Sequence, residues 1–540
     1  MKSPRLRASL ALVATVALGA GLVTGTAGTA EAKALKPATS FTMQPDGSSG
    51  KTDKGSQIPN IDSVKATIRT YYGATKGQDP ANPGKTIYLP NLSTSPYATE
   101  VEGIENKILA TLPNPAPANT AVVFDVDSTL LSDYANEEEM NFNYSPSLNA
   151  AWVTGHLFPA VPGMPALVKT LYTEGYAIFG ITGRPNTQED DTIANLTQQG
   201  FTTDGTSTGP AIFNTSNLFT KPNPSAVPAY LTCGTTCTTV QFKSLTRQYI
   251  QTNTGDTIAA NIGDQWSDLQ GGTPAASGDY KIPNPTYYLP SGTTTVPGLS
   301  PNTTFTMKPD GSSGKTVGGE NIPNLDSVKA TIRAYYNATN GIANKATSPY
   351  ISEMKALAKK WKKKLATSCQ KASHRHQRPA VVFDVDDTTL WTYDMEDGAM
   401  GFNFDPALQN QWVQGKKFPA VPGMTKVVKK AKKAGCTIVG LTGRTKNQGK
   451  ATLKNLKKVG YKGFTKRNLF LKPNTGKKYP KYIGCKKTCT TVQYKLGTRK
   501  YLEKTRHYTI VANFGDQFSD LKGGHAKKKI KLPNPTYYLP

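Results

Sequence analysis

The stretch that decides the fold reads Ala121-Val-Val-Phe-Asp125-Val-Asp127-Ser-Thr129-Leu130, and it returns as Ala380-Val-Val-Phe-Asp384-Val-Asp386-Asp-Thr388-Thr389. A run of β-branched and aromatic residues predicts a buried strand. Aspartates two residues apart leave the end of such a strand on the same face. Because neighbouring carboxylates repel each other, one of them binds a proton or a cation lies between them. Each copy of the stretch therefore predicts a chemically active strand end.

An internal duplication organises the 540-residue chain, which is too long for one hydrophobic core. Segments that begin at Phe41 and Asp62 return at Phe305 and Asp326, and Pro-Asn-Pro-Thr-Tyr-Tyr-Leu-Pro ends both copies. A repeat this long indicates tandem domains, because solenoid repeats span about 20 to 50 residues. We expect a signal peptide at 1–32, a first domain at 33–290, a linker at 291–303 and a lysine-rich second domain at 304–540.

Residues 1–32 have the features of a secretory signal peptide. A basic start precedes an apolar stretch from Ala8 to about Val23, and Ala30-Glu31-Ala32 has the small residues of a cleavage site. A membrane anchor is less favoured because the apolar stretch is short. We expect cleavage after Ala32 and a secreted, extracellular protein whose mature form has no transmembrane segment.

Six cysteines fit an oxidising compartment. The C-x3-C segments 233–237 and 485–489 favour local disulfides over zinc sites, since no second pair or nearby histidines complete a ligand set. Cys369 and Cys436 have no counterparts in the first unit, where Tyr176 takes the place of Cys436. We predict that they bond to each other, with Cys436 starting one strand and Cys369 shortly before a neighbouring strand.

The net charge of +27 belongs to the second unit. Residues 33–300 carry 15 Lys and Arg against 22 Asp and Glu, whereas residues 301–540 carry 46 against 14. This charge either attracts an anionic partner, such as a cell-surface polymer, or only keeps an exported protein soluble. Specific nucleic-acid binding is not expected, because the sequence has no recognition motif for it.

Strands that alternate with helical segments predict an α/β fold with a mostly parallel sheet flanked by helices. Helices are expected from near Asp62 and Asp326 and again before each aspartate strand. Further strands are expected at 177–182 and 257–263, with counterparts at 437–442 and 509–515. Ligands of such sheets bind beyond the carboxyl ends of the strands. The polar residues at these ends therefore predict one site in each unit.

An Asp-x-Asp-x-Thr motif at a strand end suits phosphoryl transfer, with the first carboxylate as nucleophile and the second as acid and then base. Oxygen ligands alone favour Mg²⁺. A fixed positive side chain is also needed to accept an anionic substrate. Lys243 and Lys495 offer this charge, and Lys221 and Lys472 compete for the role. The arginines of the two Thr-Gly-Arg motifs, Arg184 and Arg444, are either structural or substrate-facing.

The ordered motifs Phe-Asp-Val-Asp-x-Thr, Thr-Gly-Arg, Lys and Gly-Asp-Gln-x-Ser-Asp resemble the haloacid dehalogenase (HAD) superfamily of phosphatases. The closer resemblance is to its class B/C acid phosphatase branch, which includes plant acid phosphatases and vegetative storage proteins. Phe142-Asn143, Trp152-Val-x-x-Gly155 and Pro159-Ala-Val-Pro162 carry this closer resemblance. It spans about residues 121–272 and 380–524, and it implies two tandem HAD-like Rossmannoid domains.

The resemblance also implies a role for each motif residue. The nucleophiles would be Asp125 and Asp384, and the general acid–base residues would be Asp127 and Asp386. The further metal ligands would be Asp264 and Asp516, supported by Asp268 and Asp520. The phosphate-binding residues would be Thr182, Lys243, Thr442 and Lys495. The acid–base aspartates would lend a backbone carbonyl to the metal beside the nucleophiles. Leu496 departs from the serine usual after the motif lysine. Both units keep every motif carboxylate, so both are expected to be active.

We expect a secreted, Mg²⁺-dependent acid phosphatase that hydrolyses small phosphate monoesters through an aspartyl-phosphate intermediate. One alternative is a surface-binding or storage protein that uses the same fold with weak or no catalysis. Another is a nucleotidase or phosphotransferase of the same family.

Overall fold

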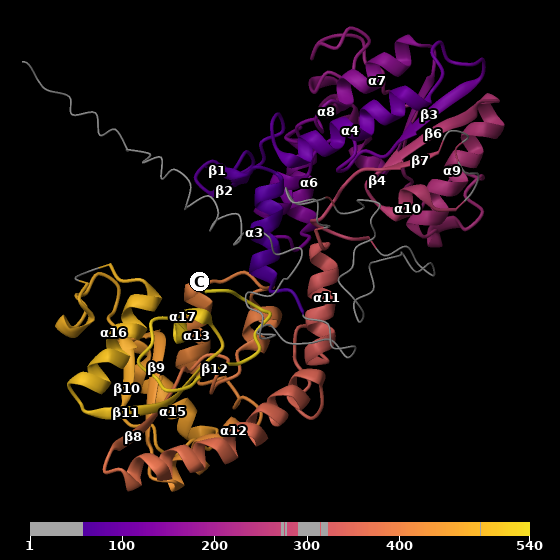
Figure 1. The fold of residues 1–540 in the computed structure, drawn as a ribbon. Coiled ribbons are helices and arrows are strands. Elements are labelled where there is room, and N and C mark those ends of the chain that lie inside the picture. The colour runs from indigo at the N-terminus through magenta and orange to yellow at the C-terminus, as the bar shows by residue number, and fades with distance from the viewer. Residues whose placement is uncertain are drawn as a thin grey trace, which may run out of the picture.

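The computed structural model describes residues 58–271, 275, 278–289, 314, 322–485 and 488–539. They form two α/β units, with helices α3 (Ile61–Tyr71) and α11 (Leu325–Tyr336) where the units meet (Figure 1). The predicted signal peptide, the predicted linker and the repeated segment from Phe41 lie outside the described residues, as does the segment from Phe305 except for Gly314.

A five-stranded sheet forms the centre of each unit, and all its strands are parallel. In the first unit the spatial order is β5 (Leu218–Lys221), β4 (Ala177–Pro185), β3 (Thr120–Phe124), β6 (Thr257–Gly263) and β7 (Asp279–Lys281). In the second it is β10 (Leu469–Lys472), β9 (Thr437–Thr445), β8 (Arg378–Phe383), β11 (Tyr508–Gly515) and β12 (Lys529–Lys531). The predicted α/β fold with a parallel sheet is therefore confirmed.

The aspartate strand lies in the middle of its sheet, and this decides where the site forms. In β3, Val123 is paired with Phe179 of β4 on one side and Asn261 of β6 on the other. Because the three strands are parallel and in this register, their carboxyl ends share one edge. Asp125, Thr182 and Asp264 lie at that edge.

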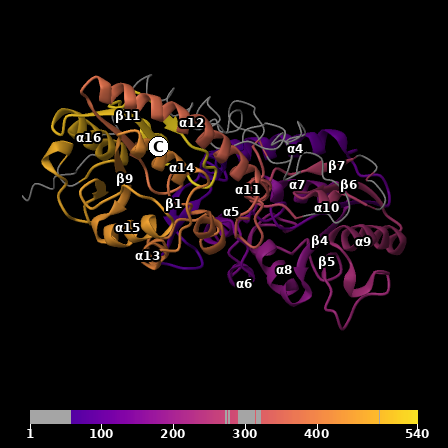
Figure 2. The ribbon, with the colours of Figure 1, turned by 90° about the horizontal axis from the view of Figure 1, so that it is seen from below.

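Helices cover both faces of each sheet (Figure 1, Figure 2). A separate two-stranded hairpin in the first unit consists of β1 (Thr75–Gln78) and β2 (Thr86–Leu89). The helices of this unit are α3, α4 (Pro96–Thr111), α5 (Tyr134–Glu139), α6 (Pro146–Thr154), α7 (Met164–Thr173), η1 (Asn186–Gln188), α8 (Glu189–Gln198), η2 (Gly234–Thr236), α9 (Thr239–Thr254) and α10 (Trp266–Leu269). Those of the second are α11, α12 (Pro349–His374), η3 (Asp394–Ala399), α13 (Pro406–Gly415), α14 (Met424–Lys433), η4 (Lys446–Gln448), α15 (Gly449–Lys458), η5 (Lys481–Ile483), α16 (Thr491–Lys504) and α17 (Phe518–Leu521). Among the described helices, none is long and apolar enough to cross a membrane.

Local sequence explains where the key helices begin. Asn60 and Asn324 accept a hydrogen bond from the backbone two residues on, and so cap α3 and α11. Thr238 and Gln241 form a capping box at the start of α9, the helix that carries Lys243. The helices expected near Asp62 and Asp326 are confirmed.

The buried apolar side chains fall into three clusters. One large cluster includes side chains from both units and from α3 and α11 between them. Two smaller clusters each lie on the other face of one sheet. Trp152 belongs to the large cluster, is fully buried and donates from Nε1 to Glu139 at 2.6 Å, so it is a core residue.

All six cysteines are paired as predicted, Cys233 with Cys237, Cys369 with Cys436 and Cys485 with Cys489. The long-range disulfide has the expected setting, because Cys436 directly precedes β9 and Cys369 lies shortly before β8, the strand next to β9. Cys369 itself lies inside α12, a 26-residue helix that continues beyond its counterpart α4, so the bond joins this helix to the start of β9.

After its aspartate strand, the second unit has one residue more than the first. The first unit has six residues of α-helix, α5, whereas the second has a π-helical turn, η3. A π turn accommodates one additional residue within a helix. The insertion thus leaves the following residues, Phe142 and Phe402, in equivalent places.

Candidate active site

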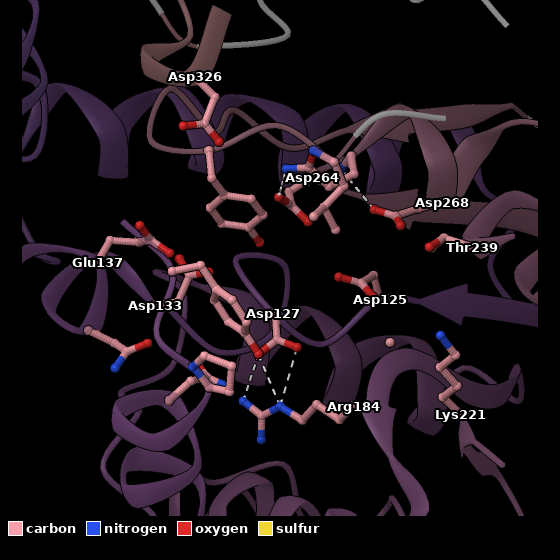
Figure 3. Close-up of a pocket in the computed structure, with 18 of the residues that line it drawn as sticks. Asp125, Asp127, Asp133, Glu137, Arg184, Lys221, Thr239, Asp264, Asp268 and Asp326 are labelled. Carbon is pink, nitrogen blue, oxygen red and sulfur yellow. Dashed lines mark hydrogen bonds and ion pairs between the residues drawn. The ribbon is translucent and has the colours of Figure 1, made fainter. Parts of the chain in front are cut away.

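Three carboxylates from two strand ends converge in each unit. Asp125 follows β3 directly, and Asp264 and Asp268 follow β6 (Figure 3). One oxygen from each of the three lies within 4.8 Å of the others, and all three side chains are buried. Asp384, Asp516 and Asp520 repeat the cluster in the second unit. Such a concentration of negative charge needs cations to balance it.

A buried lysine supplies one positive charge. Lys243 projects from α9 and donates to Asp125 and, at 2.6 Å, to Asp268. Lys495 does the same from α16, with 2.6 Å between its Nζ and Asp384. Burial opposes the charge of each lysine, but the paired carboxylates outweigh it and raise the lysine pKa. The protonated lysine is therefore a fixed part of each site.

The competing lysines take different positions. Lys221 ends β5 and is an exposed residue of the cavity wall. Lys472 donates to Thr491 at 2.9 Å. The structure thus brings Lys243 and Lys495, rather than their competitors, into contact with the first aspartates.

The second aspartate of each motif is held by the Thr-Gly-Arg segment. The Arg184 guanidinium binds Asp127 through both Nε and Nη2, with 2.7 Å from Nη2 to Oδ1 (Figure 3). Arg444 binds Asp386 in the same way. Thr182 Oγ1 lies 3.4 Å from Asp127 Oδ2. A two-pronged ion pair of this kind fixes the orientation of a carboxylate. Both arginines orient the Asp-x-Asp motif.

Asp264 offers an oxygen that is suited to a metal ion. Its Oδ2 accepts hydrogen bonds from Gln265 at 2.6 Å and Asn284 at 2.7 Å, while its Oδ1 is buried and has no hydrogen-bond partner among the described residues. A buried carboxylate oxygen without a donor is costly unless a cation binds it. Burial and the nearby Asp268 raise the pKa of Asp264 to about 6. The donor set, made only of oxygens, fits a hard divalent ion.

The glycine before this aspartate has a steric role. A Cβ at Gly263 would overlap the side chain of Asp268, which folds back to accept from Gln265 N at 2.8 Å, and Gly515 stands in the same relation to Asp520. Asp268 itself is held in place by Lys243. Glycine at this position therefore leaves room for Asp268 to join Asp264 in the carboxylate cluster.

Several residues at the site had not been predicted. Asn284 belongs to the Pro-Asn-Pro-Thr-Tyr-Tyr-Leu segment, which the sequence marked only as a repeat, and Asn534 repeats its bond by donating to Asp516 at 2.9 Å. Tyr287 donates to Asp133, and Tyr537 donates to Asp516 at 3.1 Å. The sequence signal that could have identified Asn284 and Tyr287 is that this segment is identical in both units.

A cavity of about 680 Å³ opens beside the first site. Asp133 and Glu137 line it, and neither had been predicted (Figure 3). Burial, followed by Asp264, raises the pKa of Asp133 to about 7, and burial raises that of Glu137 well above its usual range. The pKa of Asp125 is also raised well above its usual range, because burial outweighs Lys243. A bound divalent ion would oppose these shifts.

One family profile matches both units of the chain. The profile of the HAD superfamily, subfamily IIIB (acid phosphatase), matches residues 88–290 and again 316–540. Two separate matches agree with the two sheets and the two acidic clusters.

Curated relatives are found among plant proteins. A stem 28 kDa glycoprotein of Glycine max is 35% identical over 168 residues, which are 30% of this chain and 61% of the relative. Vegetative storage protein 1 of Arabidopsis thaliana is 33% identical over 29% of this chain and 55% of its own length. Acid phosphatase 1 of Solanum lycopersicum is 32% identical over 30% of this chain and 60% of its own length. The chain thus spans less than two thirds of each of these relatives.

Two solved structures are similar to part of the chain. Both are of the class C acid phosphatase from Bacillus anthracis, one of them with tungstate bound. Each is 25% identical and covers 34% of this chain and 80% of its own, with TM-scores of 0.27 and 0.28.

Proposed function

The chain belongs to the HAD superfamily, subfamily IIIB (acid phosphatase), and we propose that it is a secreted, Mg²⁺-dependent phosphomonoesterase with one active site in each unit. The observation that carries this proposal is the repeated cluster of three buried carboxylates around a buried lysine. A purely structural role would leave such a cluster costly to fold, because buried charges that face one another destabilise a protein. The same costly arrangement, kept twice, supports a chemical role.

In the first half of the proposed reaction, an Asp125 oxygen attacks the phosphorus of a phosphate monoester. The bond from phosphorus to the alcohol oxygen breaks, and Asp127 gives its proton to that oxygen. Lys243 faces the attacking carboxylate and balances the negative charge of the phosphoryl group. Asp384, Asp386 and Lys495 would do the same in the second unit. The products of this half are the free alcohol and an aspartyl-phosphate.

In the second half, Asp127 takes a proton from a water molecule whose oxygen attacks the phosphorus. The bond from phosphorus to Asp125 breaks, which releases inorganic phosphate and restores both aspartates. Arg184 holds the Asp127 carboxyl in one orientation for both proton transfers. Thr182, beside Asp127, offers a hydroxyl to a phosphoryl oxygen.

The metal would be held by Asp125, the backbone carbonyl of Asp127 and Asp264, and by Asp384, Asp386 and Asp516 in the second unit. Bound there, Mg²⁺ would neutralise negative charge on the transferring phosphoryl group. The unpaired Oδ1 of Asp264 and the oxygen-only donor set support this assignment. Asp268 and Asp520 support the site by holding the lysines.

The first test is hydrolysis of p-nitrophenyl phosphate with Mg²⁺ and with EDTA, by wild type, Asp125→Asn, Asp384→Asn and the double variant. We expect EDTA to abolish turnover, each single variant to retain part of it, and the double variant to lose at least ~10³-fold. Activity that survives in the double variant would contradict the assigned nucleophiles. An inactive wild type over a broad range of pH and substrates would favour the binding or storage role instead.

Secretion is proposed from residues 1–32 and is supported by the three disulfides, since such bonds persist in oxidising compartments. The mass and N-terminal sequence of the protein recovered from the culture medium test it. A first residue of Lys33 is expected, and retention of the protein inside the cell would contradict the proposal.

A role for the basic charge is proposed in attraction to an anionic cell-surface polymer. Exposed lysines cluster on α12, at 359, 360 and 362–364, and on α14, at 426, 429, 430, 432 and 433. The two helices pack against each other, so these exposed lysines lie on neighbouring elements. We expect salt-dependent retention on heparin-agarose that falls when the five α14 lysines are replaced by glutamine. Retention that does not change would leave the lysines as solvated surface.

A further inference from the structure

We propose that each active site is positioned by the other unit: Asn324 of α11 holds the tail of the first site, and Asn60 of α3 holds the tail of the second. The tails are residues 284–289 and 534–539. This inference rests on the proposed function for its kinetic test, but the contacts that carry it are independent of any activity.

The tail of the first unit is bound by the start of α11. Asn324 Nδ2 donates to the carbonyl oxygens of Asn284, at 3.2 Å, and Tyr287, at 2.7 Å. The backbone of Leu325 donates to Pro285 O at 2.8 Å. In return, the backbone of Tyr288 donates to Asp326 Oδ2 at 3.2 Å. The whole tail therefore lies across the first turn of a helix from the second unit.

The tail of the second unit is bound in the same way by α3. Asn60 Nδ2 donates to Asn534 O at 3.1 Å and to Tyr537 O at 2.7 Å. Ile61 N donates to Pro535 O at 2.9 Å, and Tyr538 N donates to Asp62 Oδ2 at 3.0 Å. Each contact has its counterpart in the first tail. The tandem units thus meet like the two subunits of a twofold-symmetric dimer.

Each of these helices is anchored at its other end in its own unit. Arg69 of α3 binds Glu138 at 2.7 Å, and Arg333 of α11 binds Asp397 at 2.8 Å. The ring of Tyr72 stacks on that of Tyr134, with centroids 4.1 Å apart. The C-terminal end of each helix is therefore fixed in its own unit, and its N-terminal end lies on the tail of the other unit (Figure 1, Figure 2).

The tails matter because they reach the site carboxylates. Asn284 donates to Asp264, and Tyr287 donates to Asp133. Leu289 N donates to Gln265 Oε1 at 3.0 Å, and Tyr287 and Leu289 line the cavity beside the first site. A tail without regular secondary structure depends on such bonds for its position. Loss of the Asn324 clamp would therefore loosen the wall of the first pocket.

Other contacts across the boundary hold the same wall. Asp326 and Lys329 of α11 line the cavity of the first site, and Figure 3 shows Asp326 on its upper side near Glu137 and Asp264. Lys329 donates to Phe142 O. Lys65 of α3 repeats this bond with Phe402 O at 2.7 Å. The pocket of the first site is thus built from residues of both units.

The test uses the full chain with one site silenced, so that the second site can be read separately from the first. Asp384→Asn leaves only the first site active, and Asp125→Asn leaves only the second. Asn324→Ser and Asn60→Ser are then made in both backgrounds. Serine caps a helix about as well as asparagine, so the substitution removes the amide donor while keeping the cap. The pair forms a matched control, because each variant should affect one background and spare the other.

The expected kinetic effect crosses from one unit to the other. Asn324→Ser should raise KM for p-nitrophenyl phosphate about tenfold in the Asp384→Asn background, with a smaller change in kcat, and should leave the Asp125→Asn background unchanged. Asn60→Ser should show the reverse. Effects confined to the unit that carries the substitution, or equal in both backgrounds, would overturn the proposal.

Hydrogen exchange of the same proteins, followed by mass spectrometry, gives a readout that needs no activity. Asn324→Ser should speed exchange of residues 284–289 and not of 534–539, and Asn60→Ser should do the opposite. Unchanged exchange in both tails would overturn the proposal even if the kinetics changed. If both parent variants are inactive, the proposed function fails while hydrogen exchange still decides this inference.

Discussion

The two units build the same site with one carboxylate in different places. In the first unit, Ser128 donates to Asp133, whereas in the second Thr392 donates to Asp387. Ser128 corresponds to Asp387 and Asp133 to Thr392, so the acid and the hydroxyl have changed places within one pair. Burial, followed by the nearby Asp264, raises the pKa of Asp133 to about 7, and burial, followed by Asp516, raises that of Asp387 to about 8.

Both units keep a buried pair made of one carboxylate and one hydroxyl beside Asp264 or Asp516, with the two groups at exchanged chain positions. Ser128 and Asp387 both have a positive φ, of 55° and 46°, so the exchange takes place on the same backbone. The two units therefore place the same pair of chemical groups at the same point, although different residues carry them.

The two units also differ at two positions outside the candidate active sites. Cys436 is disulfide-bonded in the second unit, whereas Tyr176 at the same place donates from its hydroxyl to Pro113 O at 2.7 Å. Glu105 lies beneath Gly163 in the first unit, and Ala358 lies beneath Gly423 in the second. These pairs let the contribution of single groups be measured within one protein.

The largest effect is expected from the buried lysines. Lys243→Met leaves Asp125 and Asp268 facing each other without a cation, and should lower the free energy of unfolding by ~3–5 kcal/mol and silence the first site. Lys495→Met should do the same in the second unit. Urea unfolding in EDTA at pH 7.5 measures both. Lys221→Met, at an exposed position of the same cavity, is the control and should change stability by less than ~0.5 kcal/mol.

The disulfide and its tyrosine counterpart should differ in strength. Cys369 and Cys436 are 67 residues apart, so replacing both with serine should cost ~4 kcal/mol through the entropy of the unfolded chain. Tyr176→Phe removes one hydrogen bond and should cost ~1 kcal/mol. Equilibrium urea unfolding compares them. Equal losses would show that the disulfide stabilises the second unit no more than one hydrogen bond stabilises the first.

Exchanging the carboxylate should transfer the second unit's arrangement to the first. In the Asp384→Asn background, Asp133→Thr should weaken Mg²⁺ binding ~10–100-fold, as expected when a group beside the ligands is lost. Adding Ser128→Asp should restore most of that affinity. Isothermal titration with Mg²⁺ measures both variants. A double variant that binds no better than Asp133→Thr would show that the position of the carboxylate does matter.

The smallest effect is expected from Glu105. Burial, with a contribution from Glu102, raises its pKa to about 7, and its Oε1 has no hydrogen-bond partner among the described residues. The unfolded chain releases this proton near pH 4.5, so the stability of the first unit falls as pH rises from about 4.5 to about 7 and is level above. Glu105→Ala should remove this fall and gain ~1 kcal/mol at pH 8. Unfolding curves at pH 5 and pH 8 check it, and a gain only at pH 5 would contradict it.

The sequence predicted the centre of each unit well. Residues 257–263 form β6 as expected, and the expected strand at 177–182 forms the first part of β4. Long apolar strands and ordered acidic motifs are local signals, and the parallel sheet follows from their alternation with helices. The edge strands β5 and β7, of four and three residues, had not been predicted, since such short segments carry little periodicity.

By itself, the sequence determined the duplication, the parallel α/β fold, the converging aspartates and the cysteine pairs, because each is written in local patterns that occur twice. Only the tertiary structure decided which lysine meets Asp125, that Arg184 grips Asp127, and that Asn284 reaches Asp264. It also decided that α11 lies on the first unit's tail, through contacts between residues about 40 apart across the boundary of the two units. The physical reason is that side-chain pairing and packing between units depend on where whole elements lie in space, which periodicity and motif spacing do not encode.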